Sequence, residues 1–276
     1  MVLKVTFYGV RGSFPCPSPA TARYGGNTAS VCVERRGAPP ILLDMGTGVH
    51  RLAADHPESP FVAAALVTHL HLDHVQGLPF FAPMQRSSTQ LDVYAPKRTE
   101  GSLAGAFADL VREPYCPFTL DDLPAVLRFH EVIDDDFELW GATVKARPVP
   151  HAGSTLGYRI EWDGTVVAYV SDHQAPEGLS TVADEVLELC DGADLLIHEA
   201  QYTSDELELK WSWGHCTPGY ALHVAREAGV HRLSLFHHDP SRSDDELDRM
   251  VRELRGAADR SGIELSAAAE GQAMVL

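Results

Sequence analysis

Three histidines and an aspartate crowd into six consecutive positions of this 276-residue chain. They are His69, His71, Asp73 and His74, and they follow an apolar run, ending at Val67, that is typical of a buried strand. Imidazoles and a carboxylate packed at a strand end would lose hydration, and protonated histidines would repel one another. A divalent cation removes both problems by binding the nitrogen and oxygen lone pairs. The spacing therefore predicts a metal site, with a histidine-rich surface turn as the alternative.

The order of these residues also carries a resemblance. His69-Leu-His71-Leu-Asp73-His74 resembles the signature of the metallo-β-lactamase fold superfamily, whose members are mostly two-metal hydrolases. The stretches Gly9-Val-Arg11-Gly-Ser and Gly25-Gly-Asn27-Thr28 resemble the opening of a bacterial branch related to ribonuclease Z and to small phosphodiesterases. The resemblance implies an α/β fold, a four-layer αββα sandwich with two packed sheets inside and helices outside.

A complete set of ligands follows from this resemblance, each at the end of a predicted strand. His69, His71 and His151 would hold one ion, Asp73, His74 and His237 would hold a second, and Asp172 would bridge the two. His238 is the alternative last ligand, although the end of the predicted strand favours His237. Nitrogen and carboxylate ligands without thiolate suit two zinc ions, and also manganese or iron.

Two further polar residues are candidates for proton transfer. His215 stands just before Thr217 and Pro218, which predict a helix start whose free N–H groups favour an anion. His215, steadied by Glu199, is therefore the candidate acid for the leaving group, and Asp73 is a candidate proton acceptor.

Supporting and substrate-binding roles are predicted for four other residues. Arg11, Asn27 and Thr217 are candidate contacts to a substrate phosphate, although loop packing is the simpler interpretation of Arg11 and Asn27. The resemblance implies that Asp44 supports the metal site without binding an ion, and an ordinary turn or cap residue is the alternative.

The elements that position these residues alternate along the chain. Strands are predicted at 2–10, 29–35, 40–44, 61–67, 91–95, 137–149, 157–162, 165–170, 193–200 and 233–236, and helices at 75–81, 182–190, from 218 onwards and at 243–260. Residues 97–136 are predicted to form an inserted helical and irregular segment that could roof the site. No linker is visible, so a single domain covering 1–276 is expected.

Composition narrows the range of partners. The formal charge of -17 is unlike that of a protein that grips a large nucleic acid through clustered basic residues. Five cysteines without a C-x-x-C pair predict reduced thiols. Without an apolar run of membrane-spanning length or a signal peptide pattern, a soluble cytoplasmic protein with no membrane partner is expected. A homo-oligomer is compatible with the sequence.

These observations favour a dinuclear metal-dependent hydrolase, and more specifically a phosphodiesterase for a small cyclic or short nucleotide-like phosphodiester. Two divalent ions can supply a hydroxide at neutral pH and clamp a scissile phosphate. Three alternatives would use the same ligands: a carbonyl hydrolase such as a lactonase or thioesterase, a transfer RNA 3′ processing nuclease, and a non-catalytic sensor that binds a metal or a nucleotide. The acidic balance and the lack of a recognisable RNA-holding arm count against the nuclease.

Overall fold

Two sheets form the centre of the computed structural model, which describes residues 2–57 and 60–276. The first contains β1 (Leu3–Gly9), β2 (Ser30–Arg35), β3 (Ile41–Leu43), β4 (Val62–Leu66), β5 (Gln90–Pro96), β6 (Val126–Val132) and β14 (Ala273–Val275), in the order β14-β1-β2-β3-β4-β5-β6. The second contains β7 (Asp135–Leu139), β8 (Ala142–Pro148), β9 (Leu156–Trp162), β10 (Thr165–Val170), β11 (Leu195–Glu199), β12 (Arg232–Phe236) and β13 (Glu264–Ala267), in the order β13-β12-β11-β10-β9-β8-β7. The predicted single domain also includes residues 1, 58 and 59, which lie outside the described residues.

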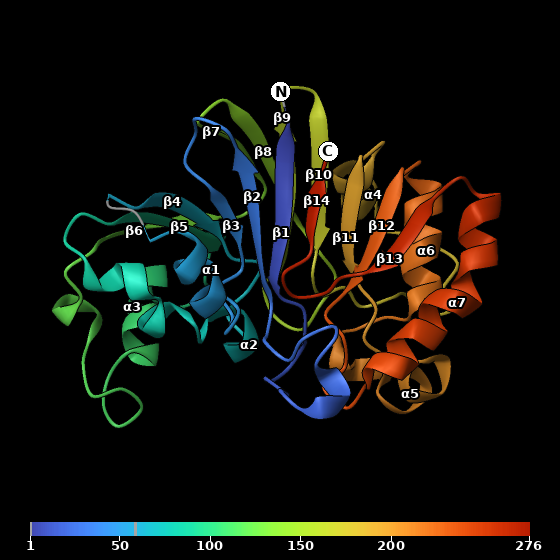
Figure 1. Ribbon diagram of the computed structural model, residues 1–276, viewed down its shortest axis with the longest axis horizontal. Coiled ribbons are helices and arrows are strands. Elements are labelled where there is room, and N and C mark those ends of the chain that lie inside the picture. Colours follow the sequence, from blue (N-terminus) through green and yellow to red (C-terminus); the bar gives the residue numbers. More distant parts are fainter. Residues whose placement is uncertain (1, 58–59) are drawn as a thin grey trace.

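Helices cover the outer face of each sheet (Figure 1). The first sheet carries α1 (Val49–Asp55) and α3 (Leu103–Leu110), and the second carries α4 (Asp184–Cys190), α6 (Pro218–Glu227) and α7 (Asp244–Arg260). The short helices α2 (Leu72–Val75) and α5 (Ser204–Leu209) lie below the strands in Figure 1. Short 3-10 turns are η1 (Pro19–Thr21), η2 (Leu78–Phe80), η3 (Ala82–Gln85), η4 (Leu120–Asp122) and η5 (Trp211–Trp213). Because α4 contacts β8 to β10 and α6 contacts β11 and β12, while α3 contacts β6, the predicted αββα sandwich is confirmed.

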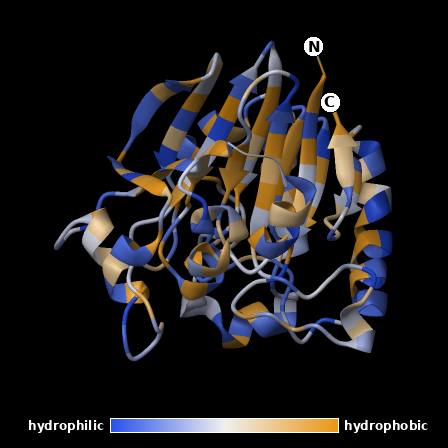
Figure 2. Ribbon diagram, turned by 60° about the vertical axis from the view of Figure 1, so that its left-hand side comes forward, coloured by the Kyte–Doolittle hydropathy of each residue, from blue (hydrophilic) through white to orange (hydrophobic). Residues whose placement is uncertain are grey.

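Apolar side chains fill the spaces between these layers. Phe7, Trp162 and Phe236 are buried between the two sheets, and Figure 2 shows hydrophobic residues concentrated along the strands. A second cluster lies between the second sheet and α4, α6 and α7, and a third lies between the first sheet and α1 and α3. Burial of apolar surface stabilises the folded state by roughly 25 cal/mol per Å². The packing between the two sheets therefore fixes their relative position.

The strand directions bring the candidate site residues to one edge. β3, β4 and β5 run parallel, as do β10, β11 and β12, and β8 shares the direction of β10 because both are antiparallel to β9. The carboxyl ends of such strands meet at the same edge, where ligands bind in open α/β sheets. The residues that emerge there are Asp44, His69, His71, His151, Asp172, Glu199 and His237.

Three predicted segments differ from the structure. The helix predicted at 75–81 is wrong: α2 already begins at Leu72 and ends at Val75, and Pro79 lies in η2 instead. Within 97–136, residues 103–110 are helical, but β6 pairs in parallel with β5 and extends the first sheet, so that segment is not one loose insertion. The strand predicted at 137–149 is a hairpin of β7 and β8, which reverses at Trp140 and Gly141 where both φ angles are positive.

A close backbone contact fixes α2 against the loop after β3. Gly77 donates its N–H to the Met45 carbonyl at 2.9 Å, and a Cβ at Gly77 would lie 2.0 Å from the Gly46 carbonyl oxygen. We expect Gly77→Ala to lower the free energy of unfolding by about 1–3 kcal/mol, because overpacking forces a backbone shift. Gly256→Ala in α7, where the nearest atom would be 3.6 Å away, should instead stabilise by about 0.5–1 kcal/mol. Chemical denaturation measures both, and unchanged stability of Gly77→Ala would contradict this packing.

Candidate metal centre

Three histidines form the first half of the cluster. His69 Nε2 lies 2.7 Å from His71 Nδ1, and His151 Nε2 lies 3.4 Å from the same atom. Burial, together with neighbouring histidines, lowers the pKa of His69 and of His71. The neutral imidazole that results is the form that binds a metal ion. The three rings can therefore present their lone pairs to one cation.

The second half combines a carboxylate with two imidazoles. Asp73 Oδ2 lies 3.1 Å from His237 Nε2 and 3.2 Å from His74 Nε2. Burial disfavours the ionised carboxyl of Asp73, but His74 and His237 outweigh it and lower its pKa. Since α2 carries Asp73 and His74, this short helix aims two side chains at His237 across the gap between the sheets.

Asp172 joins the two halves, with one oxygen toward each. Its Oδ1 lies 3.2 Å from His74 Nε2 and 3.4 Å from His237 Nε2. Its Oδ2 lies 3.6 Å from His151 Nε2 and 3.9 Å from His69 Nε2. A carboxylate placed in this way can bridge two cations.

Unpartnered atoms show that the donor set fits a cation. His74 Nε2 and Asp172 Oδ1 are buried and have no hydrogen-bond partner among the residues that the structure describes. Buried polar atoms are nearly always satisfied, so an orphaned nitrogen and oxygen that face each other need an explanation. A metal ion that accepts both lone pairs supplies one.

The geometry separates His237 from its neighbour His238. His237 directs Nε2 at Asp73 and Asp172, and its backbone has the positive φ of 52°, which is rare outside glycine and common at functional sites. His238 instead donates Nε2–H to the Ala268 carbonyl, and burial beside Arg11 lowers its pKa to about 3. His237 is therefore the candidate ligand.

Asp44 is buried behind the cluster and orients His74. Its Oδ2 lies 2.8 Å from His74 Nδ1 and accepts from the Tyr169 hydroxyl at 2.8 Å, while its Oδ1 accepts from the Thr68 N–H. A carboxylate on the far nitrogen of a histidine fixes the tautomer and directs Nε2 to the metal side. We therefore keep, as a proposal, the supporting role of Asp44 behind the metal site.

We expect Asp44→Ala to weaken metal affinity by about 10–100-fold, because His74 would lose its fixed tautomer and orientation. Competition with a fluorescent chelator measures the change. Tyr169→Phe removes only one of the hydrogen bonds to Asp44 and serves as the matched control, with a smaller effect. Equal affinities of Asp44→Ala and the parent protein would contradict this role.

His215 faces the cluster and rests on Glu199. The fully buried Glu199 accepts from His215 Nδ1 at 3.1 Å and from the backbone N–H groups of His173 and Cys216. Burial opposes protonation of His215, but Glu199 and Asp172 outweigh it and raise the pKa of His215 to about 9. Because Nδ1 is engaged by Glu199, Nε2 is the nitrogen free to act on a substrate. His215 Nδ1 also lies 3.7 Å from Asp172 Oδ2, so the ring stands directly beside the candidate bridging carboxylate.

The expected phosphate contacts of Arg11, Asn27 and Thr217 are corrected by the structure. Arg11 is fully buried and donates to three backbone carbonyls, and Asn27 donates its side-chain N–H to Glu270. Thr217 accepts from Tyr220 N–H as the cap of α6 and lines a separate pocket against α7. These hydrogen bonds tie the three side chains to other parts of the protein, so we infer that they stabilise loops and a helix end.

Several residues near the cluster were missed by the sequence analysis. The Ser13 N–H donates to Asp73 Oδ2 at 2.7 Å, and Gln201 Nε2 donates to the Ser13 hydroxyl. Lys97 and Arg98 line a pocket together with His69 and His71. The basic pair just after the strand at 91–95 is a signal that could have found Lys97 and Arg98, and Ser13 closes the Gly9-Val-Arg11-Gly-Ser stretch, whereas nothing local marks Gln201.

The fold and this cluster define a metal-dependent hydrolase. A family model described as "Beta-lactamase superfamily domain" matches residues 40–238, and the chain belongs to this family. Among the described residues no helix is long and apolar enough to cross a membrane.

Relatives match almost the whole chain. A ribonuclease Z of Haloarcula marismortui is 25% identical over 94% of this chain and 93% of its own length, and one of Halobacterium salinarum is 29% identical over 86% and 87%. Among similar solved structures, the metallo-beta-lactamase fold protein YhfI of Bacillus subtilis has a TM-score of 0.74 at 20% identity, and the match covers 100% of this chain and 99% of YhfI. A diphosphatase of the PhnP family has a TM-score of 0.72 at 20% identity, with 100% of this chain and 98% of the diphosphatase covered. Zinc-bound PqqB of Methylobacterium extorquens has a TM-score of 0.72 at 18% identity, with 98% of this chain and 99% of PqqB covered.

Proposed function

We propose that this protein is a dinuclear metal-dependent phosphodiesterase that acts on a small phosphodiester. The observation that carries the proposal is the Asp172 carboxylate, which directs one oxygen to each half of a buried histidine and aspartate cluster. His69, His71 and His151 would hold one cation, Asp73, His74 and His237 would hold the other, and Asp172 would touch both. When bound, the two cations would lower the pKa of a water molecule and neutralise charge on the phosphate.

Zinc is the cation that we propose for both positions. Imidazole and carboxylate donors without thiolate suit it, and manganese or iron are the alternatives that the same donors allow. Zinc is also the ion recorded in the PqqB neighbour. The free thiols do not compete for it at this site, because none of the five cysteines belongs to the candidate ligand groups around Asp172.

The chain itself would supply the protons and the orientation. His215, held through Nδ1 by Glu199, would deliver a proton from Nε2 to the leaving oxygen, as a general acid. Glu199 touches no substrate in this scheme and acts as a positioning residue. Asp73 is the proposed proton acceptor, and the Ser13 N–H holds its Oδ2 in place.

A small substrate agrees with the charge of the protein. With 22 basic and 39 acidic side chains, the chain has a formal charge of -17, which opposes long-range attraction of a polyanion. Lys97 instead places a cationic side chain at the pocket that contains His69 and His71, which suits a single short phosphate ester.

A panel of four chromogenic substrates tests the reaction class. Protein loaded with zinc or manganese should hydrolyse bis(p-nitrophenyl) phosphate faster than a phosphomonoester, a thioester or a lactone. Preference for the thioester or the lactone would overturn the phosphodiesterase proposal in favour of a carbonyl hydrolase. Two bound metals without any turnover would favour a sensor.

Processing of transfer RNA 3′ ends is the second candidate, because relatives named ribonuclease Z align with nearly the full chain. A precursor transfer RNA with a 3′ trailer distinguishes the two candidates. Cleavage of this RNA with a higher kcat/KM than any small phosphodiester would replace our first candidate with the second.

A further inference from the structure

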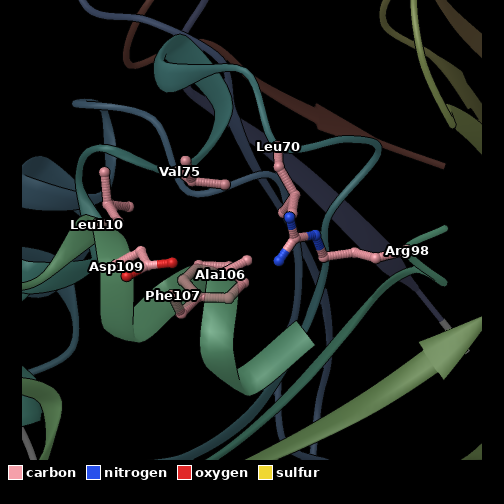
Figure 3. A pocket seen from close by; sticks show the side chains of 7 residues that line it. All are labelled: Leu70, Val75, Arg98, Ala106, Phe107, Asp109 and Leu110. Carbon is pink, nitrogen blue, oxygen red and sulfur yellow. The ribbon is translucent and has the colours of Figure 1, made fainter. Parts of the chain in front are cut away.

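A pocket beside the metal centre is lined by α2, α3 and the chain after β5 (Figure 3). Its cavity measures about 410 Å³, within the range of about 300–1,000 Å³ that is usual for small-molecule sites. Leu70 and Arg98 line both this pocket and the neighbouring one that contains His69 and His71. We define the cavity against α3 as the α3 pocket, and these two shared residues place it next to the pocket that contains His69 and His71.

The α3 pocket has two apolar walls. Figure 3 shows Leu70 and Val75 on one side and Ala106 and Phe107 on the opposite side. Val75 and Phe107 are buried against the core, so their positions are fixed by packing with the rest of the third cluster. A flat apolar group could therefore lie between two pre-formed surfaces.

Charged groups stand at the two ends of this slot. Arg98 is half-buried and directs its guanidinium into the pocket between Leu70 and Ala106 (Figure 3). Within the described residues, Arg98 has no hydrogen-bond or ion-pair partner. Asp109 lies at the other end and is exposed, with Arg112 as its neighbour on α3 at 3.0 Å. Arg98 is thus an available donor, and Asp109, whose Oδ1 already accepts from Arg112, offers its Oδ2 as an acceptor.

We propose that the α3 pocket binds the nucleobase of a nucleotide substrate whose phosphodiester lies at the metal centre. A nucleobase has two apolar faces and a polar edge, and proteins bind it by stacking on side chains and by hydrogen bonds to that edge. The apolar walls match the faces, Arg98 donates to ring nitrogen or carbonyl acceptors, and Asp109 accepts from an exocyclic amine. This inference rests on the proposed phosphodiesterase function and names its substrate class.

Other occupants match the pocket less well. An acyl chain would bury its carbons between the walls but would leave Arg98 desolvated without an acceptor, which is unfavourable. A second phosphate would satisfy Arg98 but would lie against Leu70, Ala106 and Phe107 and face the carboxylate of Asp109. A nucleobase satisfies the walls and both ends together.

A competition experiment tests the proposal with product-like ligands. Adenosine 5′-monophosphate and ribose 5-phosphate carry the same phosphate, but only the first has a base. Each is titrated as an inhibitor of bis(p-nitrophenyl) phosphate hydrolysis by the metal-loaded protein, and the binding of each is also measured directly by calorimetry. We expect the nucleotide to bind about tenfold more tightly than the sugar phosphate, because only the nucleotide has a base that can stack.

Variants of α3 locate the binding. Ala106→Trp fills the pocket and should abolish the tenfold preference, whereas Ala108→Trp, on the same helix but lining a different pocket, should keep it. Arg98→Ala should reduce the preference, and Arg249→Ala on the exposed face of α7 is the charge-matched control. Equal binding of the two ligands by the parent protein, or an unchanged preference in Ala106→Trp, would overturn the proposal. Calorimetry measures the preference for the nucleotide even if the protein does not hydrolyse bis(p-nitrophenyl) phosphate. Absence of hydrolysis would count against the phosphodiesterase function and would leave the test of the α3 pocket intact.

Discussion

Replacing Asp172 with alanine is expected to lower kcat/KM for a phosphodiester by about 10³-fold or more. One oxygen of this carboxylate lies within 4 Å of His69 and His151, and the other lies within 4 Å of His74 and His237. Charge stabilisation by metal ions is worth several kcal/mol, and about 1.4 kcal/mol corresponds to a factor of ten in rate. Loss of the bridge should therefore remove the larger part of the metal contribution, and the bound metal should fall below two equivalents.

Two further variants keep this prediction specific. Asp172→Asn preserves the volume of the side chain and removes its charge, so it should lose activity and metal without a large change in unfolding temperature. Asp259→Ala, on the exposed face of α7, removes an acidic group remote from the cluster and should behave like the parent protein. Full activity of Asp172→Asn with two bound metals would contradict the bridging role.

His215→Ala should lower kcat by about 10²–10⁴-fold for a substrate with an alkoxide leaving group, such as a cyclic nucleotide, while two metals stay bound. The loss should be much smaller for bis(p-nitrophenyl) phosphate, because p-nitrophenolate leaves without protonation. Steady-state kinetics on both substrates, together with metal analysis, measure this difference.

The same experiment separates an acid from a ligand at position 215. His215 lies near His151 and Asp172, in a group that could also hold a cation. If His215→Ala loses a metal, and activity on both substrates falls equally, His215 is a ligand and not the acid. Glu199→Gln should also lower kcat more for the alkoxide leaving group than for p-nitrophenolate, but by less than His215→Ala does. The glutamine retains a hydrogen-bond acceptor for His215 Nδ1 but loses the charge that stabilises the protonated ring.

The sequence was informative wherever a site residue ended a buried strand. An apolar run followed by a polar residue marks the carboxyl end of a strand, and β4, β10 and β12 each end next to candidate ligands in this way. The predicted strands 157–162 and 165–170 are separated by Asp163 and Gly164, and this pair readily adopts the positive φ angles that a hairpin turn requires.

The errors arose where tertiary packing decides the outcome. β6 was taken as part of an insertion, although Leu127 and Phe129 alternate with Arg128 and His130 as an edge strand requires. Arg11 was a candidate phosphate contact because a guanidinium in a Gly-rich loop suits an anion. Its burial against the carbonyls of Asp239 and Arg242, more than two hundred positions away, could not be read from local sequence.

The most direct test of the central claim is a metal titration followed by activity. Zinc or manganese is added stepwise to metal-stripped protein, and hydrolysis of bis(p-nitrophenyl) phosphate is measured at each step. We expect activity to rise with metal and to level off at two equivalents per chain, with no comparable rise for Asp172→Ala. Saturation at two equivalents without turnover, or turnover that Asp172→Ala retains, would contradict a dinuclear phosphodiesterase.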